Sequence, residues 1–432
     1  MNDVALTRKL SWIIAIVLIL LPFHAFFTTW LGSNFGHLDS WRIWKELIIV
    51  ALSPLAIWLA WREPSIKKWL KTSWLPRLIL LYTFVYIILG ARALLIGNVN
   101  RNALIYGLLI DLRFLGFFMI CLVVSSKNEF LKRHWQKIVV IPALIVISFG
   151  ILQRFVLPYD FLKHFGYGPK TIPAYQTVDN KIDYRRIQST LRGANPLGAY
   201  LVLAIMFLWM KRHKVLNIIA LAVAGTALFY TYSRSAWLGL FIAAGLFSYW
   251  SLRDKKAKQY WYLTAVIFIV VTLAGVVIFR NNQVVQNTVF HTDTTSTSVE
   301  SSNEDRVEAL NNGIQDVVRE PIGRGPGTAG PASFRNNHTP RIAENYFLQV
   351  GQEVGWLGMM LFMMINLLVA RLLWQQKQDI LARILLAVFV GLTIVNMFSH
   401  AWTDDTLALL WWGMTGIALS VMMNKKQKHV QI

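Results

Sequence analysis

Cysteine and charged residues are both scarce in this sequence. Its 432 residues include one cysteine, Cys121, and only 15% are charged, whereas 55% are hydrophobic. A single cysteine excludes an intramolecular disulfide, so the redox compartment cannot be read from cysteine usage. A soluble domain cannot hide so many apolar side chains from water. The composition therefore indicates an integral membrane protein.

Several motifs that identify common functions are also absent. The sequence has no Walker loop, no His/Cys metal cluster, no G-x-S-x-G elbow and no haem motif. These absences argue against ATP-driven transport and hydrolysis by a serine triad, and neither a metal nor a cofactor is expected. No cleavable signal peptide is predicted, because the first apolar run is long enough to span a membrane and lacks a small-residue cleavage site.

Long apolar runs recur along almost the whole chain. Runs of roughly 20 residues fit a hydrocarbon core about 30 Å thick. They predict an all-α polytopic membrane protein with about twelve transmembrane helices, forming one integral membrane domain over residues 1–432. The predicted spans lie near residues 10–30, 44–61, 77–95, 105–125, 137–156, 195–210, 215–230, 236–252, 260–279, 345–370, 381–399 and 406–424.

Basic residues are concentrated in alternate connections between these spans. One side of the membrane receives 24 of the 43 Lys and Arg residues, mostly in short loops. The positive-inside rule makes this side cytoplasmic and places both termini there. The net charge of +21 is then a topology signal with some attraction to anionic lipid, and nucleic-acid binding is not expected.

Two long loops, about 157–194 and 280–344, fall on the opposite, outer side. Long loops between spans are usually functional or disordered. The positive-inside rule disfavours arginine on this side, so an anionic ligand is the predicted reason for it, with lipid phosphate headgroups as the alternative. The arginines concerned are Arg185, Arg186, Arg192, Arg306, Arg319, Arg324, Arg335 and Arg341.

The second loop divides into three parts. Residues 281–305 are polar and rich in Ser and Thr, which predicts a flexible excursion. Residues 305–319 show the apolar spacing of an amphipathic helix. The segment PIGRGPGTAGP at 321–331 either lets backbone amides approach an anion closely or forms ordinary turns.

Ionisable residues also occur at or near membrane depth, where they are costly unless paired or functional. Glu344, at the predicted boundary of a span, is either an interfacial salt-bridge partner or a catalytic base. Asp111 and Arg113 lie mid-span and are expected to pair with each other, to pair with neighbouring helices, or to line a polar cavity. His400, Asp404 and Asp405 occupy the last outer turn, where they either pair with arginines or help to hold the site.

Several local patterns occur in a defined order. Arg234 to Leu238 forms R-x-x-x-L after an aromatic-rich span. Arg186, Thr190, Asn195 and Pro196 approximate R-x-x-G-T-F with a downstream Asn-Pro pair, with Ser189 in the glycine position. Arg306 precedes a helix that ends in Pro321, Gly323, Gly325 and Gly327. Together with the span layout, these patterns resemble the O-antigen ligase and O-antigen polymerase superfamily, membrane glycosyltransferases of the GT-C type.

The chain departs from this superfamily at one motif. The H-x(10)-G motif begins with a histidine that is often regarded as catalytic, but alignment on Gly355 places Glu344 there, followed by Asn345. A glutamate can still act as a general base toward a hydroxyl. His338, six residues upstream, is an alternative base if the loop folds back.

The resemblance implies a GT-C-like membrane fold with short helices in its large outer loop, in the plasma (inner) membrane of a bacterium. It implies a metal-independent transfer of a polyprenyl-diphosphate-linked glycan, of the undecaprenyl diphosphate type, onto an acceptor hydroxyl at the outer face. The acceptor is lipopolysaccharide core, another glycolipid or another envelope molecule. Glu344 is the implied base, and the implied donor-binding residues are Arg186, Arg234, Arg306, Asn195, Asn345 and His338.

Other functions remain open at this point. A polymerase of the same superfamily would join repeat units while both partners are lipid-linked. A secondary transporter or flippase for an anionic solute or lipid would also suit twelve spans with inside termini, although no inverted repeat is evident. A non-catalytic binder of lipid-linked glycan is compatible with the missing histidine.

Overall fold

The computed structural model describes residues 3–178, 181–210, 215–290 and 302–423. Its elements, in chain order, are α1 (Asp3–Leu20), η1 (Leu21–Phe23), α2 (His24–Phe35), α3 (Leu38–Arg42), α4 (Trp44–Arg62), α5 (Pro64–Thr72), α6 (Trp74–Leu95), α7 (Arg101–Lys127), α8 (Phe130–Phe155), η2 (Phe161–Phe165), β1 (Gln176–Val178), β2 (Lys181–Arg186), α9 (Ala194–Trp209), α10 (Val215–Tyr230), α11 (Arg234–Ser251), α12 (Lys255–Ile278), α13 (Gln283–Val285), η3 (Gln286–Phe290), α14 (Ser302–Arg319), η4 (Gly330–Arg335), α15 (Tyr346–Gln375), α16 (Ile380–Met397), η5 (Ala401–Thr403) and α17 (Asp405–Leu419).

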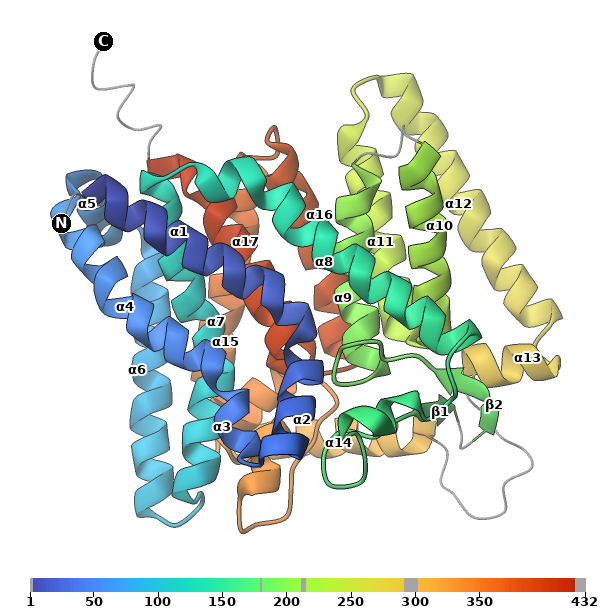
Figure 1. The fold of residues 1–432 in the computed structure, drawn as a ribbon, viewed down its shortest axis with the longest axis horizontal. Coiled ribbons are helices and arrows are strands. Elements are labelled where there is room, and N and C mark those ends of the chain that lie inside the picture. Colours follow the sequence, from blue (N-terminus) through green and yellow to red (C-terminus); the bar gives the residue numbers. More distant parts are fainter. Residues whose placement is uncertain (1–2, 179–180, 211–214, 291–301, 424–432) are drawn as a thin grey trace.

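The long helices form a bundle, and the connections collect at its two ends (Figure 1). The antiparallel hairpin β1–β2, the short helix α3 and the amphipathic helix α14 lie at one end, which we call the loop end. The short helix α5, with Lys67, Lys68 and Lys71, lies at the opposite end together with the α11–α12 connection. The two predicted outer loops therefore meet at a single end of the bundle.

Nine helical segments within the described residues are long and apolar enough to cross a membrane, and α9 and α10 are shorter apolar helices. Every predicted span falls on a helix, so the prediction of an α-helical polytopic membrane protein is confirmed. The count of twelve stays a prediction. The described parts of α9 and α10 have 16 residues each, about 24 Å at 1.5 Å per residue, and residues 211–214 between them lie outside the described part of the chain.

Two expectations about the outer loops were incomplete or wrong. The first loop contains a two-stranded sheet in which Gln176 lies opposite Arg186, and the sequence did not predict strands there. Residues 281–305 were expected to form a flexible excursion, but 283–290 are helical and α14 begins at Ser302. Residues 291–301 lie outside the described part of the chain.

Small residues let some helices approach closely in the core. Gly239 of α11 faces Gly391 of α16, and a Cβ atom built on Gly239 would lie 2.9 Å from the carbonyl oxygen of Gly391. Such small-residue contacts are typical of helix pairs in membranes, where backbone approach replaces the hydrophobic driving force. The apolar helix α12 differs, because none of its residues is buried and it lies at the periphery of the bundle (Figure 1).

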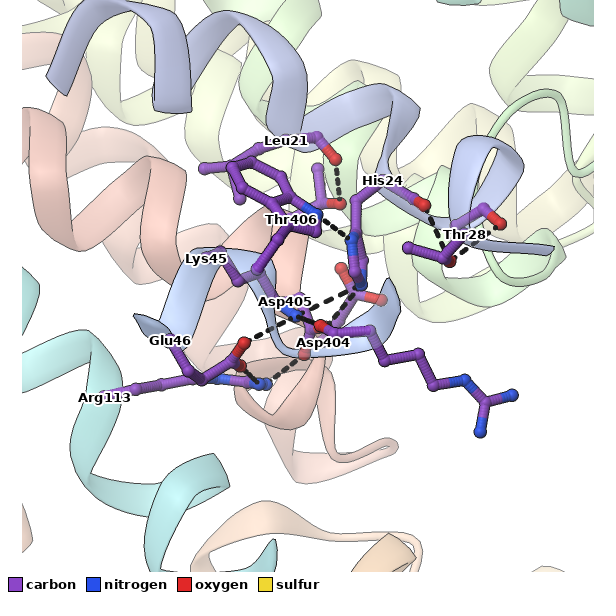
Figure 2. A network of polar contacts seen from close by, with 12 residues as sticks. Leu21, His24, Thr28, Lys45, Glu46, Arg113, Asp404, Asp405 and Thr406 are labelled. Atoms are coloured by element: carbon purple, nitrogen blue, oxygen red, sulfur yellow. Dashed lines mark hydrogen bonds and ion pairs between the residues drawn. The ribbon is translucent and has the colours of Figure 1, made fainter. Parts of the chain in front are cut away.

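A buried ion-pair network ties α2, α4, α7 and α17 together (Figure 2). Arg113 of α7 pairs with Asp405 and with Glu46, whose Oε1 lies 2.6 Å away. Lys45 Nζ lies 2.8 Å from Asp405 Oδ2 and 3.1 Å from Glu46 Oε2, and His24 Nε2 lies 3.1 Å from Asp405 Oδ2. Arg113 therefore pairs with neighbouring helices, one of the arrangements predicted for it.

Asp111, two residues from Arg113, belongs to a different buried group. Its Oδ1 accepts a hydrogen bond of 2.9 Å from the Tyr346 hydroxyl. The carboxyl group of Glu353 in α15 lies nearby. Asp111 thus fastens α7 to the N-terminal half of α15, the helix that directly follows Glu344.

Candidate functional site

Two adjoining cavities open at the loop end. Cavity A has a volume of about 970 Å³, and its lining includes Arg186, Asn195 and Glu344. Cavity B has a volume of about 380 Å³, and its lining includes Arg234, Arg306 and again Glu344. Both volumes lie in the range of ligand sites in proteins. Because Glu344 lines both cavities, it marks their junction.

The hairpin β1–β2 positions Arg186 in the lining of cavity A. Ile187 N donates to the carbonyl of Tyr230 at the end of α10 (3.0 Å), which ties the end of the hairpin to the bundle. Arg186 Nε then donates to the carbonyl of Thr231 (2.8 Å), and its Nη2 donates to Asn195 Oδ1 (2.5 Å). Both partners are neutral oxygens. The guanidinium is therefore oriented without being neutralised.

Arg234 and Arg306 lie close enough to Arg186 for their charges to act on it. Burial, followed by the positive charges of Arg306 and Arg234, lowers the pKa of Arg186 to about 10. The side chain is still protonated at neutral pH, so like charges are held together at a cost in free energy. An anion bound among them would relieve that cost.

Arg234 is the first residue of α11, and its Nη1 donates to the carbonyls of Val289 (3.0 Å) and Phe290 (3.2 Å). It therefore fixes the short helical segment at 283–290 against the site. Arg306 lies in the first turns of α14, and its Nε is 4.0 Å from Glu344 Oε2. Arg306 thus reaches the carboxylate from the opposite wall of cavity B.

Glu344 has an unusual backbone conformation. Its φ of 50° lies in the left-handed region, which residues other than glycine enter at a cost. Such strain persists only where the surroundings impose it, and it is concentrated at functional sites. Here Asn345 imposes it by capping α15 immediately afterwards. Its Oδ1 accepts from Leu348 N (3.0 Å), and its Nδ2 donates to the carbonyl of Met397 (3.0 Å).

The predicted site residues therefore fall into two groups. The structure brings Arg186, Asn195, Arg234, Arg306 and Glu344 together around the two cavities. Asn345 instead serves as a helix cap, next to Glu344. His338 lies at the α6–α7 turn, where its Nε2 is 3.1 Å from the carbonyl of Gly97, and it lines neither cavity.

The glycine-rich segment 321–331 does not present its amides to a ligand. Arg324 N and Gly325 N donate to the carbonyls of Gln352 (3.0 Å) and Glu353 (2.8 Å) in α15, and Gly327 N donates to Glu353 Oε1 (2.8 Å). The helix is kinked there, with φ of 65° at Gly355, so its carbonyls are exposed to the segment. Of the two alternatives for this segment, the contacts favour ordinary turns packed on α15, and the carboxyl group that its Gly327 amide contacts is the protein's own Glu353.

Most of the surplus loop arginines also have structural partners. Arg341 pairs with Asp316 (2.8 Å) and Glu320 (3.0 Å), and Arg324 pairs with Glu320 (2.5 Å). Arg185 donates to the carbonyls of Gln153 and Arg154 at the end of α8, both at 2.8 Å. Excess arginine in the sequence therefore indicated the correct end of the molecule, but geometry separates the site arginines from the others.

The α16–α17 turn contributes side chains that the sequence flagged only weakly. His400 and Asp404 line cavity A together with Arg192. Burial, and next the charge of Arg192, lowers the pKa of His400 to about 4, while burial raises the pKa of Asp404 above its usual value. His400 therefore presents a neutral imidazole to the cavity at physiological pH. Its place in an outer turn was the only signal available.

The fold and site together define a class: a multi-pass α-helical membrane protein whose loop end encloses an arginine-rich pair of cavities. The family model for the O-antigen ligase matches residues 218–363, which confirms the resemblance to the O-antigen ligase superfamily. The matched segment holds Arg234, Arg306 and Glu344, whereas Arg186 and Asn195 precede it. No curated protein matches the chain.

Proposed function

We propose that this protein is a membrane glycosyltransferase that moves a glycan from a polyprenyl diphosphate onto an acceptor hydroxyl at the outer face of the bacterial plasma membrane, in the manner of an O-antigen ligase. One observation carries the proposal: three arginines and one strained carboxylate converge where cavities A and B meet. The family match supports a lipid-linked glycan as substrate. The active site belongs to one integral membrane domain, residues 1–432, with loops 157–194 and 280–344 forming it.

The arginines suit the leaving group. When the glycosidic bond to the diphosphate breaks, negative charge concentrates on the diphosphate oxygens. Preorganised guanidinium groups stabilise such charge strongly, because they need no reorganisation as it develops. Arg186 has neutral hydrogen-bond partners, and the charges of its two arginine neighbours destabilise its own charged form. A diphosphate is therefore a better partner for Arg186 than any that it has within the described residues.

Glu344 is positioned to receive the acceptor proton. Its Oε2 lies 4.0 Å from Arg306 Nε. A diphosphate that binds Arg306 would draw this guanidinium away and leave Glu344 as the free acceptor. The acceptor oxygen then forms a bond to the anomeric carbon as the carbon–oxygen bond to the diphosphate breaks. The proton passes to Glu344, and polyprenyl diphosphate leaves.

The two cavities suit different parts of the donor. Apolar side chains dominate cavity B, including Leu238, Val307, Leu310 and Phe398, and these fit the first isoprene units beside the diphosphate. Cavity A is larger and is lined by more polar groups, including Gln176, Asn195 and His400, which fit sugar hydroxyls. The reacting carbon would lie at their junction, next to Glu344.

Cells provide the direct test. Cells that lack this protein, or that carry Glu344→Gln, should accumulate polyprenyl-diphosphate-linked glycan and lose a surface glycoconjugate, whose chemistry identifies the acceptor. General-base removal typically costs about 10²–10⁴-fold in rate. Unchanged lipid-linked pools and unchanged surface glycans, with the variant shown to be in the membrane, would refute the proposal.

Arginine variants test the site itself. Arg234→Ala and Arg306→Ala should remove most transfer activity while leaving expression intact. Arg319→Ala is the matched control, because Arg319 ends the same helix as Arg306 but lines neither cavity. Normal transfer by both site variants would contradict the assignment of these arginines.

The products separate the related functions. With purified protein and lipid-linked donor, a single addition to a preformed acceptor indicates a ligase, whereas a ladder of lipid-linked products indicates a polymerase. Movement of lipid across liposomes without any covalent product would instead favour a flippase.

A further inference from the structure

A third cavity, cavity C, lies at the loop end beside the ion-pair network of Figure 2. Its volume is about 440 Å³, and it is enclosed by α2, α4, α7 and the start of α17, with residues of the outer loops at its rim. The proposed function leaves this space unused.

Cavity C adjoins cavity A. Pro173, Arg192 and Asp404 line both cavities, so side chains alone separate them. Together with the shared Glu344, the three cavities form a series in which B adjoins A and A adjoins C. A glycan of several sugars bound at the reaction centre would therefore extend towards C.

The charged groups in the wall of cavity C largely pair with one another. Lys45 Nζ contacts Asp405 (2.8 Å), Glu46 (3.1 Å) and the carbonyl of Arg42 (2.7 Å), and Arg113 contacts Glu46 (2.6 Å). Apolar residues of similar volume often hold helices together as well as such a buried network does. Because the charges of this network already have partners, a strongly charged ligand would gain little there. A ligand that exchanges hydrogen bonds, such as a sugar, suits the polar edge of the network better.

The rim supplies the other features of a carbohydrate site. The Arg335 guanidinium stacks over the ring of Tyr106 at 4.3 Å from its centroid, and the neighbouring Phe334 side chain is exposed. Arg192 makes no ion pair or hydrogen bond with any side chain or backbone group of the described residues, although it lies close enough to Asp404 and His400 to affect both. An aromatic rim with one uncommitted cation fits a hydroxyl-rich ligand that is neutral or carries an isolated acidic group.

We propose that cavity C is a second carbohydrate subsite, which binds sugars of a glycan remote from the bond being formed. This inference rests on the proposed glycosyltransferase function and extends it. Two sources share the chemistry: the distal sugars of the lipid-linked donor and the glycan of the acceptor. The subsite would select glycans by their length and by the sugars beyond the reacting one.

Thr28→Trp fills the cavity without touching the proposed reaction centre. Thr28 lies on α2 and lines cavity C, and its hydroxyl donates to the carbonyl of His24 four residues earlier (2.8 Å). Thr226→Trp is the matched control, because Thr226 donates in the same way to Ala222 (3.0 Å) on the exposed side of α10. Arg335→Gln is a milder second variant, which removes the guanidinium from the exposed rim without adding bulk.

Binding to protein in nanodiscs separates the sources, with two probes: polyprenyl diphosphate without sugar, and the lipid-linked glycan extracted from the producing cells. Both cavity variants should bind the sugar-free probe like the wild type, which also shows that they are folded. If the donor glycan occupies cavity C, they bind the lipid-linked glycan at least about tenfold more weakly. If the acceptor glycan occupies it, donor binding is unchanged and the KM for the extracted surface glycolipid rises by a similar factor.

The inference is overturned if the folded Thr28→Trp and Arg335→Gln proteins bind the donor and use the acceptor as the Thr226→Trp control does. Failure of the proposed function would look different, because wild-type protein would then transfer nothing and Arg186→Gln would not weaken binding of the sugar-free probe. Even then, weaker binding of the lipid-linked glycan by the cavity variants would support a carbohydrate subsite.

Discussion

Arg113 and Arg186 both lie in protected positions, but their surroundings differ in kind. Arg113 contacts two carboxylates, from Glu46 and Asp405, and the carbonyl of Thr403 (3.0 Å). Arg186 contacts one backbone carbonyl and one amide oxygen, and it is repelled by the positive charges of two further arginines. The charge of Arg113 is balanced by carboxylates of the protein itself. The charge of Arg186 has no carboxylate partner among the described residues, so a bound anion could balance it.

The difference gives a rule for reading arginines in this protein. A saturated arginine holds helices together, and its loss leaves buried carboxylates unpaired. An arginine that lines cavity A or B and is held only by neutral oxygens, as Arg186 is, keeps its charge available for a substrate, and we expect its loss to leave the fold intact. Two loop arginines also have acidic partners within the fold: Arg341 pairs with Asp316 of α14 and with Glu320, and Arg324 pairs with Glu320.

The largest expected effect comes from Arg113→Ala. Removing one partner of a buried ion pair typically costs about 3–5 kcal/mol, so the variant should unfold at a clearly lower temperature in detergent and should accumulate poorly. Arg133→Ala, which breaks an exposed pair with Glu129, should cost less than about 1 kcal/mol. Equal unfolding temperatures for the two variants would contradict the structural role assigned to Arg113.

Arg186→Gln should have the next largest effect, on activity instead of stability. Loss of one donor to a developing anion typically lowers kcat by about 10²–10³-fold, and the unfolding temperature should stay near that of the wild type. Arg154→Gln is the control, since Arg154 stacks on Tyr230 nearby, at 4.6 Å from the ring centroid, but lines neither cavity. Destabilisation of Arg186→Gln without a loss of kcat would reverse its assignment.

A smaller effect is expected from His400. Its pKa is about 4 in the folded protein and near 6.5 when unfolded, so between these values the unfolded chain binds the extra proton. Its contribution to stability should therefore fall as pH drops from about 6.5 to about 4 and level off below that. Asp404, with a raised pKa, contributes the opposite slope above its unfolded value, near 3.8.

The difference between wild type and His400→Gln isolates the histidine. Thermal unfolding across pH 4–7 should show the wild type losing more stability on acidification than the variant does. Identical slopes would mean that His400 is more accessible to solvent than its place in cavity A implies.

The general architecture was predictable because bilayer thickness constrains apolar runs so strongly. The same constraint leaves the number of spans open near α9 and α10, whose apolar helices are described over 16 residues each. The hairpin β1–β2 escaped prediction because its strands are three and six residues long and mix charged with apolar side chains. Its geometry depends on distant partners, such as the hydrogen bond from Ile187 to Tyr230.

The sequence identified Arg186, Arg234, Arg306 and Glu344 through local patterns, and the structure brings these residues together. It did not separate them from residues with similar chemistry. His338 and Glu344 are six positions apart and equally plausible on paper, yet one lies at the α6–α7 turn and the other in cavity A. The sequence of the glycine-rich segment is compatible with an anion-binding loop. Its amides instead bond to carbonyl groups of α15, which become available only because that helix is kinked, and the sequence does not show the kink.

That kink also has a consequence for substitution. Gly323 and Gly355 both have positive φ, and a Cβ atom at either would lie within 2.5 Å of the backbone of the other's segment: Glu353 O for Gly323, and Pro321 O for Gly355. A mutation at one position cannot be accommodated by a change of side chain at the other, because each meets main chain. The two glycines therefore act as one structural unit, because a side chain at either position would disrupt the same contact between the glycine-rich segment and the bend of α15.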